Sequence, residues 1–330
     1  MGISRPADPG ELLGTLPEPA AVPVITVRQL MWQRFRRNRL AMIGGVVVLL
    51  LYVSALFGGF IAPYERTRTF STYVGVPANP PRIIDKEGKL HWPPFVYGYV
   101  AKLEPGTYRR IYETNDEMYP VRLFVKGDTY KFLFWETDVH LFGAEGRGVI
   151  FLMGTDRLGR DYFSRILYGS QISLTVGLIG VLVSLVIGSL VGVAAGLFGG
   201  IFDNITNRVI EVIMAFPRIP LWMALASALP ANIDPLKVYF GITLVLAVVN
   251  WGWLARQVRA KVMALRDSDY VTAARLANSG NMRVITRHLF PNTLSHVIVE
   301  ATLAIPRTIL GETALSFLGL GIRPPMTSWG

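Results

Sequence analysis

Three long runs of uncharged residues stand out along the chain. They cover residues 40–62, 172–202 and 238–254, and contain 23, 31 and 17 residues respectively. A helix rises about 1.5 Å per residue, so about 20 apolar residues cross the hydrocarbon core of a membrane. The pattern therefore predicts three membrane spans, of which the third, bounded by Lys237 and Arg256, is short.

Two further apolar segments are interrupted by charged residues and prolines. Residues 205–229 carry Arg208 and Glu211, and residues 294–321 carry Glu300, Arg307 and Glu312. A charge at the centre of a span costs about 2.5–3.5 kcal/mol on insertion scales, so such residues face a partner or a water-filled path. Arg208 and Glu211 are expected to pair on one helix face. The candidates for intramembrane pairing or for a transport path are Glu211, Glu300, Arg307 and Glu312.

Counting both segments gives five spans in an all-α polytopic membrane protein. Basic residues before the first run and in the loop at 256–291 place the N-terminus in the cytoplasm, because positive flanks stay inside. The predicted organisation is a cytoplasmic tail and basic amphipathic helix (1–39), a first span (40–62), an extracytoplasmic insert (63–149) and a helical core with spans two to five (150–330). The insert contains "VRLFVKGDTYKFLFW", in which β-rich arms flank Gly127-Asp128, so a two-residue hairpin turn is predicted there.

Composition supports the membrane class and excludes several kinds of chemistry. Hydrophobic residues make up 51% of the chain and charged residues 17%, against about a quarter charged in soluble domains. The net charge of +10 gathers next to span ends, which indicates membrane orientation rather than nucleic-acid binding. The chain has no cysteine, its four histidines lack metal-ligand spacing, and it has no GxxxxGK[ST] phosphate-binding loop. No metal, no cofactor and no catalysis are therefore expected for this chain.

The loop at 256–291 predicts two short helices. Ser268 is a good N-cap, and Gly280 is expected to adopt the left-handed conformation that ends the first helix. Asn281 would cap the second helix and Pro291 would end it. A helix this short barely forms alone, so it needs a surface: a groove of a partner, or the cytoplasmic face of its own protein. The face offered consists of Tyr270, Ala273, Ala274 and Ala277.

The stretch "YVTAARLANSGNMRVITRHLFPN" (270–292) resembles the EAA loop of ATP-binding cassette (ABC) importer permeases. The Glu-Ala-Ala of that signature reads Thr272-Ala273-Ala274 here, and its glycine is Gly280. Four further stretches resemble the dipeptide/oligopeptide/nickel subfamily in its second-permease, DppC/OppC-like type: "GTDRLGRDYFSRILYGSQISL" (154–174), "AGLFGGIFDN" (195–204), "AFPRIPL" (215–221) and "GETALSFLGLGIRPPMTSWG" (311–330). The resemblance covers about residues 28–62 and 150–330.

The resemblance implies a type I ABC importer transmembrane domain, with residues 150–330 as the permease core. Six spans are expected where five are predicted, so either a final span is missing from this sequence or its C-terminus ends outside the membrane, and the insert is long for the family. The residues implied in ATPase coupling are Ser268, Tyr270, Thr272, Ala273, Ala274, Arg275, Ala277, Gly280, Arg283, His288 and Pro291.

The implied function is import of di- or oligopeptides across the inner membrane of a prokaryote. The implied partners are a homologous second permease, two ABC ATPases that bind ATP and Mg, an external binding protein, the peptide and the bilayer. Nickel or another small solute is the alternative within the family. From a different class, a secondary transporter or channel would use Glu300, Arg307 and Glu312, but that function leaves the cytoplasmic helix unexplained.

Overall fold

A computed structural model describes residues 27–103, 105–106, 110–132, 134–230 and 233–330. The chain divides into two compact units, Met1–Leu50 and Leu51–Gly330. Most of the cytoplasmic tail predicted within residues 1–39 lies outside the described residues.

The first unit contains α1 (Val27–Arg37) and most of α2 (Arg39–Leu56). The last turn of α1 carries Arg34, Arg36 and Arg37, which complement the negative end of the helix dipole. The Asn38 side chain accepts a hydrogen bond from Ala41 N at 3.2 Å and so caps the start of α2. The predicted basic helix is confirmed as a helix, while its position on a membrane surface stays a prediction.

The three uncharged runs form helices that are long and apolar enough to cross a membrane. These are α2, α4 (Tyr162–Phe198) and α7 (Pro235–Leu265). A fourth candidate arises if α5 (Gly200–Ala215) and α6 (Arg218–Ser227), bent by 91° at their break, count as one span. The fifth predicted segment forms α10 (Phe290–Phe317), which is not among these candidates in the described part of the chain. The count of five spans is therefore not confirmed.

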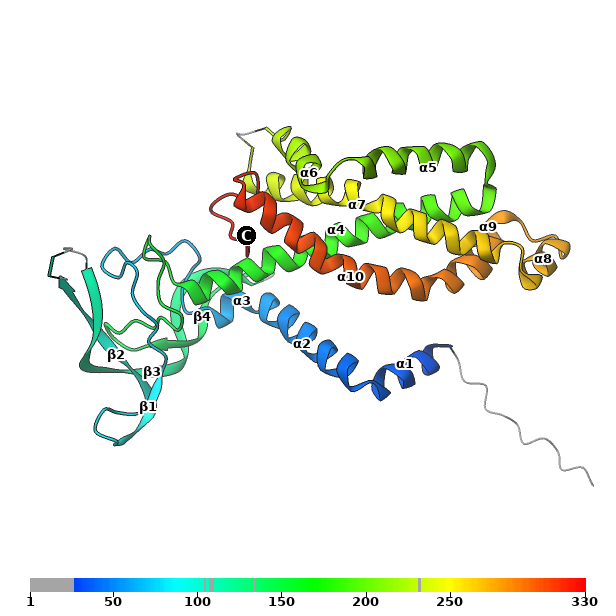
Figure 1. Ribbon diagram of the computed structural model, residues 1–330. Helices are drawn as coiled ribbons and strands as arrows, with labels where there is room; N and C mark the ends of the chain where they lie inside the picture. Colours follow the sequence, from blue (N-terminus) through cyan, green and yellow to red (C-terminus); the bar gives the residue numbers. More distant parts are fainter. Residues whose placement is uncertain (1–26, 104, 107–109, 133, 231–232) are drawn as a thin grey trace, which may run out of the picture. The chain divides into compact units, whose positions relative to one another are not determined.

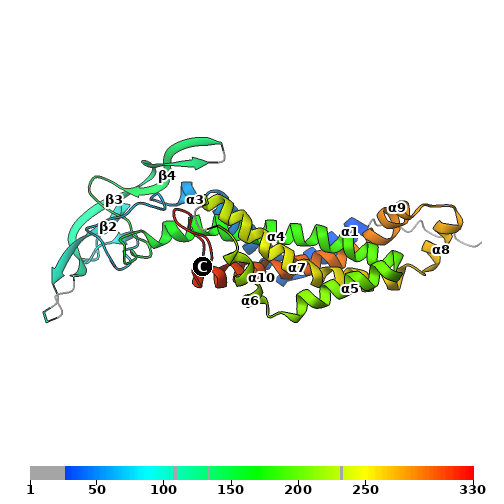
Figure 2. The same ribbon diagram turned by 90° about the horizontal axis from the view of Figure 1, so that it is seen from above.

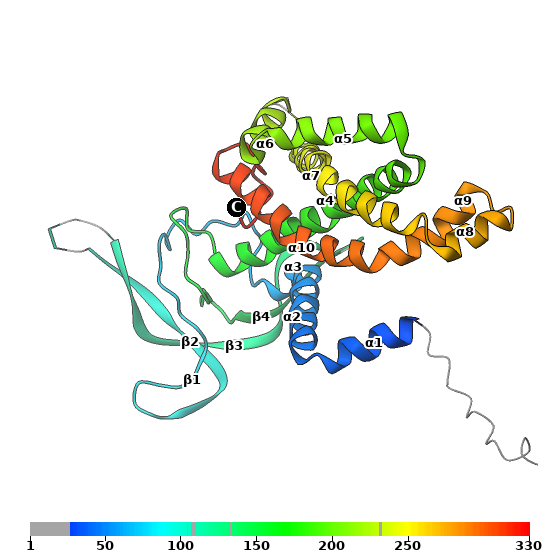
Figure 3. The same ribbon diagram turned by 45° about the vertical axis from the view of Figure 1, so that its right-hand side comes forward.

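The helices of the second unit pack closely because glycines line their contacts. Gly188, Gly192 and Gly196 recur at every fourth residue of α4. A Cβ on Gly192 would lie 2.6 Å from Ala255 O of α7, so only glycine allows this approach. α10 lies against the same two helices (Figure 1, Figure 3). A stripe of small residues thus sets the distance between α4 and α7.

A four-stranded antiparallel sheet follows α3 (Gly58–Ile61). Its strands are β1 (Arg82–Ile84), β2 (Leu90–Leu103), β3 (Arg110–Phe132) and β4 (Trp135–Ala144), in that spatial order. Val76, Tyr112 and Phe151 form a buried cluster beneath it. The sheet lies at the N-terminal end of α4, away from the short helices α8 and α9 (Figure 2). A small sheet is therefore present after the first long hydrophobic helix, and its extracytoplasmic position stays a prediction.

The hairpin turn predicted at Gly127-Asp128 is wrong. β3 continues through both residues with a register shift between Lys126 and Tyr130, and the hairpin closes between Phe132 and Trp135. The glycine is needed for space rather than for a turn, because a Cβ on Gly127 would lie 2.7 Å from the His140 ring. This register shift is a bulge in β3, where the four-residue step from Lys126 to Tyr130 lies opposite the two-residue step from Val139 to Thr137.

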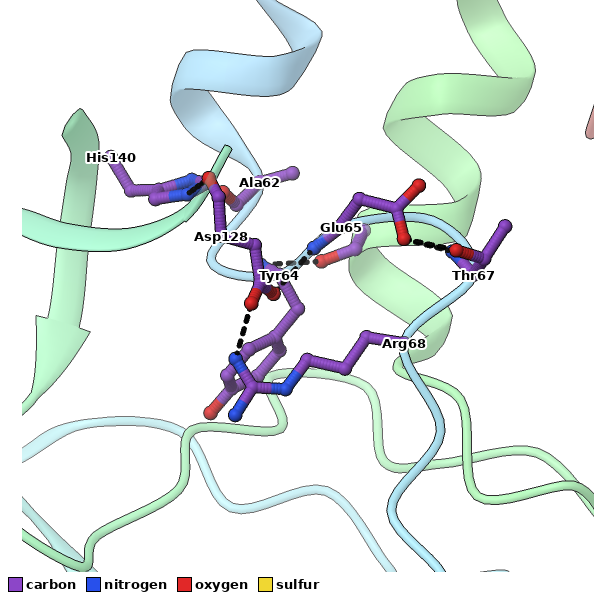
Figure 4. Close-up of polar contacts among 8 residues, drawn as sticks. Ala62, Tyr64, Glu65, Thr67, Arg68, Asp128 and His140 are labelled. Carbon is purple, nitrogen blue, oxygen red and sulfur yellow. Dashed lines mark hydrogen bonds and ion pairs between the residues drawn. The ribbon is translucent and has the colours of Figure 1, made fainter. Parts of the chain in front are cut away.

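The same bulge ties the sheet to the segment after α3 (Figure 4). The two ring nitrogens of His140 lie 2.5 Å from Ala62 O and 2.9 Å from Asp128 O. The Asp128 carboxylate accepts hydrogen bonds from Glu65 N at 3.0 Å and from Arg68 Nη1 at 2.8 Å. These contacts fix the base of the sheet to the end of the first hydrophobic segment.

Candidate functional site

The loop predicted to couple to a partner forms a small structure at one end of the bundle (Figure 1). It comprises α8 (Asp269–Leu276), α9 (Asn281–Arg283) and the π-helix η1 (Val284–Leu289), which leads into α10. Val271 is the one buried residue of α8. It packs with Val284 and Leu289 in a cluster that includes Val258 and Val262 of α7 and Leu197 of α4. The loop is therefore anchored to its own bundle through one face.

The opposite surface of α8 is free. Tyr270, Ala273 and Ala277 are exposed, and Ala274 is half-buried. Thr272 and Arg275 are also exposed. The sequence left two partners open for this helix, its own protein or another one. The Val271 side packs on its own bundle, and the side with small residues remains available to another protein.

α8 begins where the sequence predicts, but the Ser268 side chain makes a different hydrogen bond from the one expected of an N-cap. Ser268 is the N-cap residue, with an extended backbone at φ −72° and ψ 153°. Its hydroxyl donates to Leu265 O at 2.6 Å instead of accepting a hydrogen bond from the helix. Asp269 in the first turn complements the positive end of the helix dipole.

The turn after α8 uses a different left-handed residue from the one predicted. Asn278 has φ 58°, whereas Gly280 is extended, with φ −63° and ψ 158°. Asn278 N donates to Arg275 O at 2.9 Å and Ser279 N donates to Ala274 O at 3.0 Å, which is the Schellman pattern. Asparagine tolerates this conformation better than other non-glycine residues. The prediction for Gly280 is therefore wrong by two positions.

The second half of the loop also differs from expectation. Gly280, rather than Asn281, is the N-cap residue of α9. Pro291 does not end a helix: it lies in the first turn of α10, directly after η1, and the helical backbone runs on through it. The His288 ring lies 6.3 Å from the Tyr270 ring, and Arg283 is exposed. The implied coupling residues thus lie on both arms of one compact loop.

Two exposed apolar side chains were missed by the sequence analysis. Leu276 at the end of α8 is 84% exposed, and Met282 after the turn is 72% exposed. Leu276 lies five residues after the buried Val271, which places it off the packed face, and this spacing is the signal that could have identified it. The two side chains flank the turn and extend the free surface of α8.

The charged residues of the interrupted segments divide into three groups. Arg208 Nη1 and Glu211 Oε2 lie 3.3 Å apart, so the predicted pair is confirmed. Glu312 is fully buried, and its Oε1 accepts a hydrogen bond from Ser316 on the same helix at 2.5 Å. Glu300 and Arg307 line one cavity, and neither forms an ion pair within the described residues.

Comparison with known proteins gives two family matches. A model of the binding-protein-dependent transport system inner membrane component matches residues 186–330, which include the whole loop. A model of the N-terminal TM domain of oligopeptide transport permease C matches residues 26–81.

Individual relatives carry names of the same kind. A putative peptide transport system permease protein of Brucella suis biovar 1 is 40% identical over 183 residues, 56% of this chain and 60% of the relative. The dipeptide transport system permease protein DppC of Bacillus subtilis is 29% identical over 308 residues, 93% of this chain and 73% of the relative. The glutathione transport system permease protein GsiD of Escherichia coli O1:K1 is 28% identical over 299 residues, 91% of this chain and 74% of the relative.

Proposed function

We propose that the chain, which matches the models of the transport-system inner membrane component and of oligopeptide transport permease C, is an ABC importer permease of the DppC/OppC-like type. It would be a membrane-spanning subunit that translocates di- and oligopeptides. The peptide would be delivered by an external binding protein, and ATP hydrolysis would occur on partner subunits. The observation that carries the proposal is the free surface of α8. A short helix that is anchored by Val271 alone and exposes small residues suits a groove on another protein.

The arrangement of the second unit supports this topology. The sheet adjoins the first residues of α4, whereas α8 packs beside Leu197 near the last residue of α4 (Figure 1). A helix of 37 residues is about 55 Å long, which exceeds the roughly 30 Å hydrocarbon core. A membrane crossed by α4 therefore separates the sheet from α8. With α8 in the cytoplasm, the sheet would face the binding protein outside, the N-terminus would lie inside, and α5–α6 and α10 would supply the third and fifth spans.

The buried cluster explains how movement of α8 would reach the spans. Val271 and Val284 of the loop share one close-packed cluster with Leu197, Val258 and Val297, which belong to α4, α7 and α10. Packed interiors have low compressibility and transmit displacement. When two ATP- and Mg-loaded ATPase subunits close, they would move α8, and the ends of three helices would follow as a rigid body. A homologous second permease would form the other half of the path.

The proposal is tested by co-purification of the chain with its second permease and two ATPase subunits from the membrane. Ala273→Trp fills the exposed small-residue face without disturbing the packed one, so we expect insertion in the membrane and loss of the ATPase subunits. Ala101→Trp, at an exposed position of β2, is the matched control and should retain the complex. A wild-type chain that never associates with an ATPase would overturn the proposal.

A further inference from the structure

Two arginines of the interrupted segments each follow a proline and line the same cavity. Arg218 directly follows Pro217 at the 91° bend between α5 and α6, and Arg307 directly follows Pro306 inside α10. Both side chains line the same cavity. Arg218 is the first residue of α6, and Arg307 follows a proline that removes one backbone N–H donor from the continuous helix α10. We call Arg218 and Arg307 the arginine pair.

The cavity lies midway along the bundle. Asn250 is the central residue of α7, Ser184 is close to the centre of α4, and Glu300 and Arg307 flank the centre of α10. For helices that cross a membrane, this is the depth at which a charge is most costly. Ionisable groups at this depth therefore face a partner or a water-filled path.

These charges have no partner among the residues that the structure describes. Arg218, Arg307 and Glu300 form no ion pair or side-chain hydrogen bond in the described part of the chain. Other arginines contrast with them, since Arg165 lies 2.6 Å from Asp156 and Arg259 is held by Asp203. Two arginines and one glutamate give the cavity a formal charge of +1. Its unmet requirement is one negative charge.

The space around the arginine pair indicates what kind of anion fits. The cavity has a volume of about 50 Å³, more than the 10–15 Å³ that one water needs but far below the roughly 300–1,000 Å³ of whole-ligand pockets. A second, wider groove of about 500 Å³ also includes both arginines, and is otherwise lined by Pro217, Trp222, Leu310, Gly311 and Ala314 among others. The arginine pair therefore lines both cavities. The smaller one has room for a single charged group, and the larger, mainly apolar one is of ligand size.

We propose that Arg218 and Arg307 bind the C-terminal carboxylate of a peptide in transit, while the adjoining groove receives the rest of the peptide. The inference rests on the proposed function and names the substrate group that this chain recognises. Guanidinium groups match carboxylates through paired, charge-assisted hydrogen bonds. Glu300 keeps the site at one positive charge, so that it is neutral once one carboxylate is bound.

The test uses the complete transporter, with binding protein, second permease and ATPases, in proteoliposomes. Uptake is measured for Ala-X-Ala tripeptides and for the same tripeptides with an amidated C-terminus. The binding protein contributes equally to every variant, so the acid-to-amide uptake ratio compares variants directly. We expect Arg218→Gln and Arg307→Gln each to lower this ratio about tenfold or more, as loss of a charged hydrogen-bond donor does, with amide uptake unchanged. Arg208→Gln, whose side chain is exposed and paired with Glu211, should keep the wild-type ratio.

Each outcome decides one statement. An unchanged acid-to-amide ratio in both glutamine variants would overturn the carboxylate assignment, whether uptake stays the same or falls equally for acid and amide. The proposed peptide permease function would still stand. An arginine pair that binds a lipid phosphate instead would give this unchanged ratio. No uptake of either peptide by the wild type would contradict the proposed function itself. If a glutamine variant fails to assemble, Arg307→Lys decides: an intermediate ratio supports the assignment, because charge remains without the paired geometry, and the wild-type ratio contradicts it.

Discussion

Asp203 on α5 and Arg259 on α7 form a two-point ion pair across the bundle. Arg259 Nη2 lies 2.5 Å from Asp203 Oδ2, and Arg259 Nε donates to Oδ1. The two side chains are 11% and 23% exposed, and Asn207 donates a further hydrogen bond to the same carboxylate at 2.8 Å. The pair joins the first turn of α5 to the part of α7 that leads toward α8, so it holds the base of the loop that contains α8.

Removal of one member of this pair should destabilise the protein. Loss of one partner from a fully buried pair costs about 3–5 kcal/mol, and the partial exposure here reduces our expectation for Arg259→Met to about 1–3 kcal/mol. Thermal unfolding in detergent checks this. Arg208→Met breaks an exposed pair worth about 0–1 kcal/mol and is the control. Equal losses in the two variants would contradict a special role for Arg259.

Features set by residues close in the sequence could be predicted, whereas contacts between residues far apart in the sequence could not. Uncharged runs identified α2, α4 and α7, and the three-residue spacing identified the Arg208–Glu211 pair. The Asp203–Arg259 pair could not be found, because its members are separated by 56 positions and meet only when α5 packs on α7.

Glycine gave the least reliable local signal. Gly127 was interpreted as a turn residue, but it makes room for the His140 ring on the neighbouring strand β4. The sequence alone does not show which residues of β3 and β4 lie opposite each other. Gly280 was interpreted as left-handed, but Asn278 takes that conformation. In both cases the glycine fitted a local preference for turns or left-handed backbone, but the tertiary packing determined the backbone conformation.

Leu276 should contribute to ATPase binding. Its side chain is 84% exposed at the end of the free face of α8, so Leu276→Asp should leave the fold intact and weaken the complex about tenfold or more. Binding of the purified ATPase subunit to the permease in nanodiscs measures the effect. Leu90→Asp, at a 74% exposed position in β2, is the matched control. Normal ATPase affinity in Leu276→Asp would exclude the residue from the contact.

The left-handed residue that ends α8 should be intolerant of β-branching. The backbone of Asn278 at φ 58° disfavours a β-branched side chain, so Asn278→Val should destabilise the turn by about 1–2 kcal/mol. Asn278→Gly should be tolerated. Hydrogen exchange of the Ser279 amide, which donates to Ala274 O, reports the turn directly. Faster exchange in both variants alike would show that backbone conformation is not the cause.

Gly159 should be irreplaceable in the segment before α4. Its φ is 72°, and a Cβ there would collide with the Phe70 carbonyl, so Gly159→Ala should cost well over 1 kcal/mol in thermal unfolding. Gly88 has φ 85° with no atom close to the added Cβ, so Gly88→Ala measures the backbone conformation alone, about 1–2 kcal/mol. The difference between the two variants isolates the steric collision with Phe70. A smaller loss in Gly159→Ala than in Gly88→Ala would contradict that collision.

Asp161 should make stability depend on pH. Its Oδ2 accepts a hydrogen bond from Ser164 N at 2.8 Å and caps α4, while its buried Oδ1 has no partner among the described residues. Burial raises the pKa of Asp161 to about 6. The folded state therefore holds the proton more tightly than the unfolded state, whose carboxyl has a pKa of about 4.

It follows that protonation of Asp161 stabilises the folded state fully below about pH 4, and that this contribution is lost as pH rises through about 6. Asp161→Asn keeps a capping oxygen and removes the ionisation. The difference in unfolding free energy between wild type and Asp161→Asn should change by about 2–3 kcal/mol between pH 4 and pH 7, in favour of the wild type at low pH. Asp161→Ala also removes the cap and should lower stability by a further 0.5–2 kcal/mol or so at every pH. A difference between wild type and Asp161→Asn that does not change with pH would show that the buried carboxyl does not control this dependence.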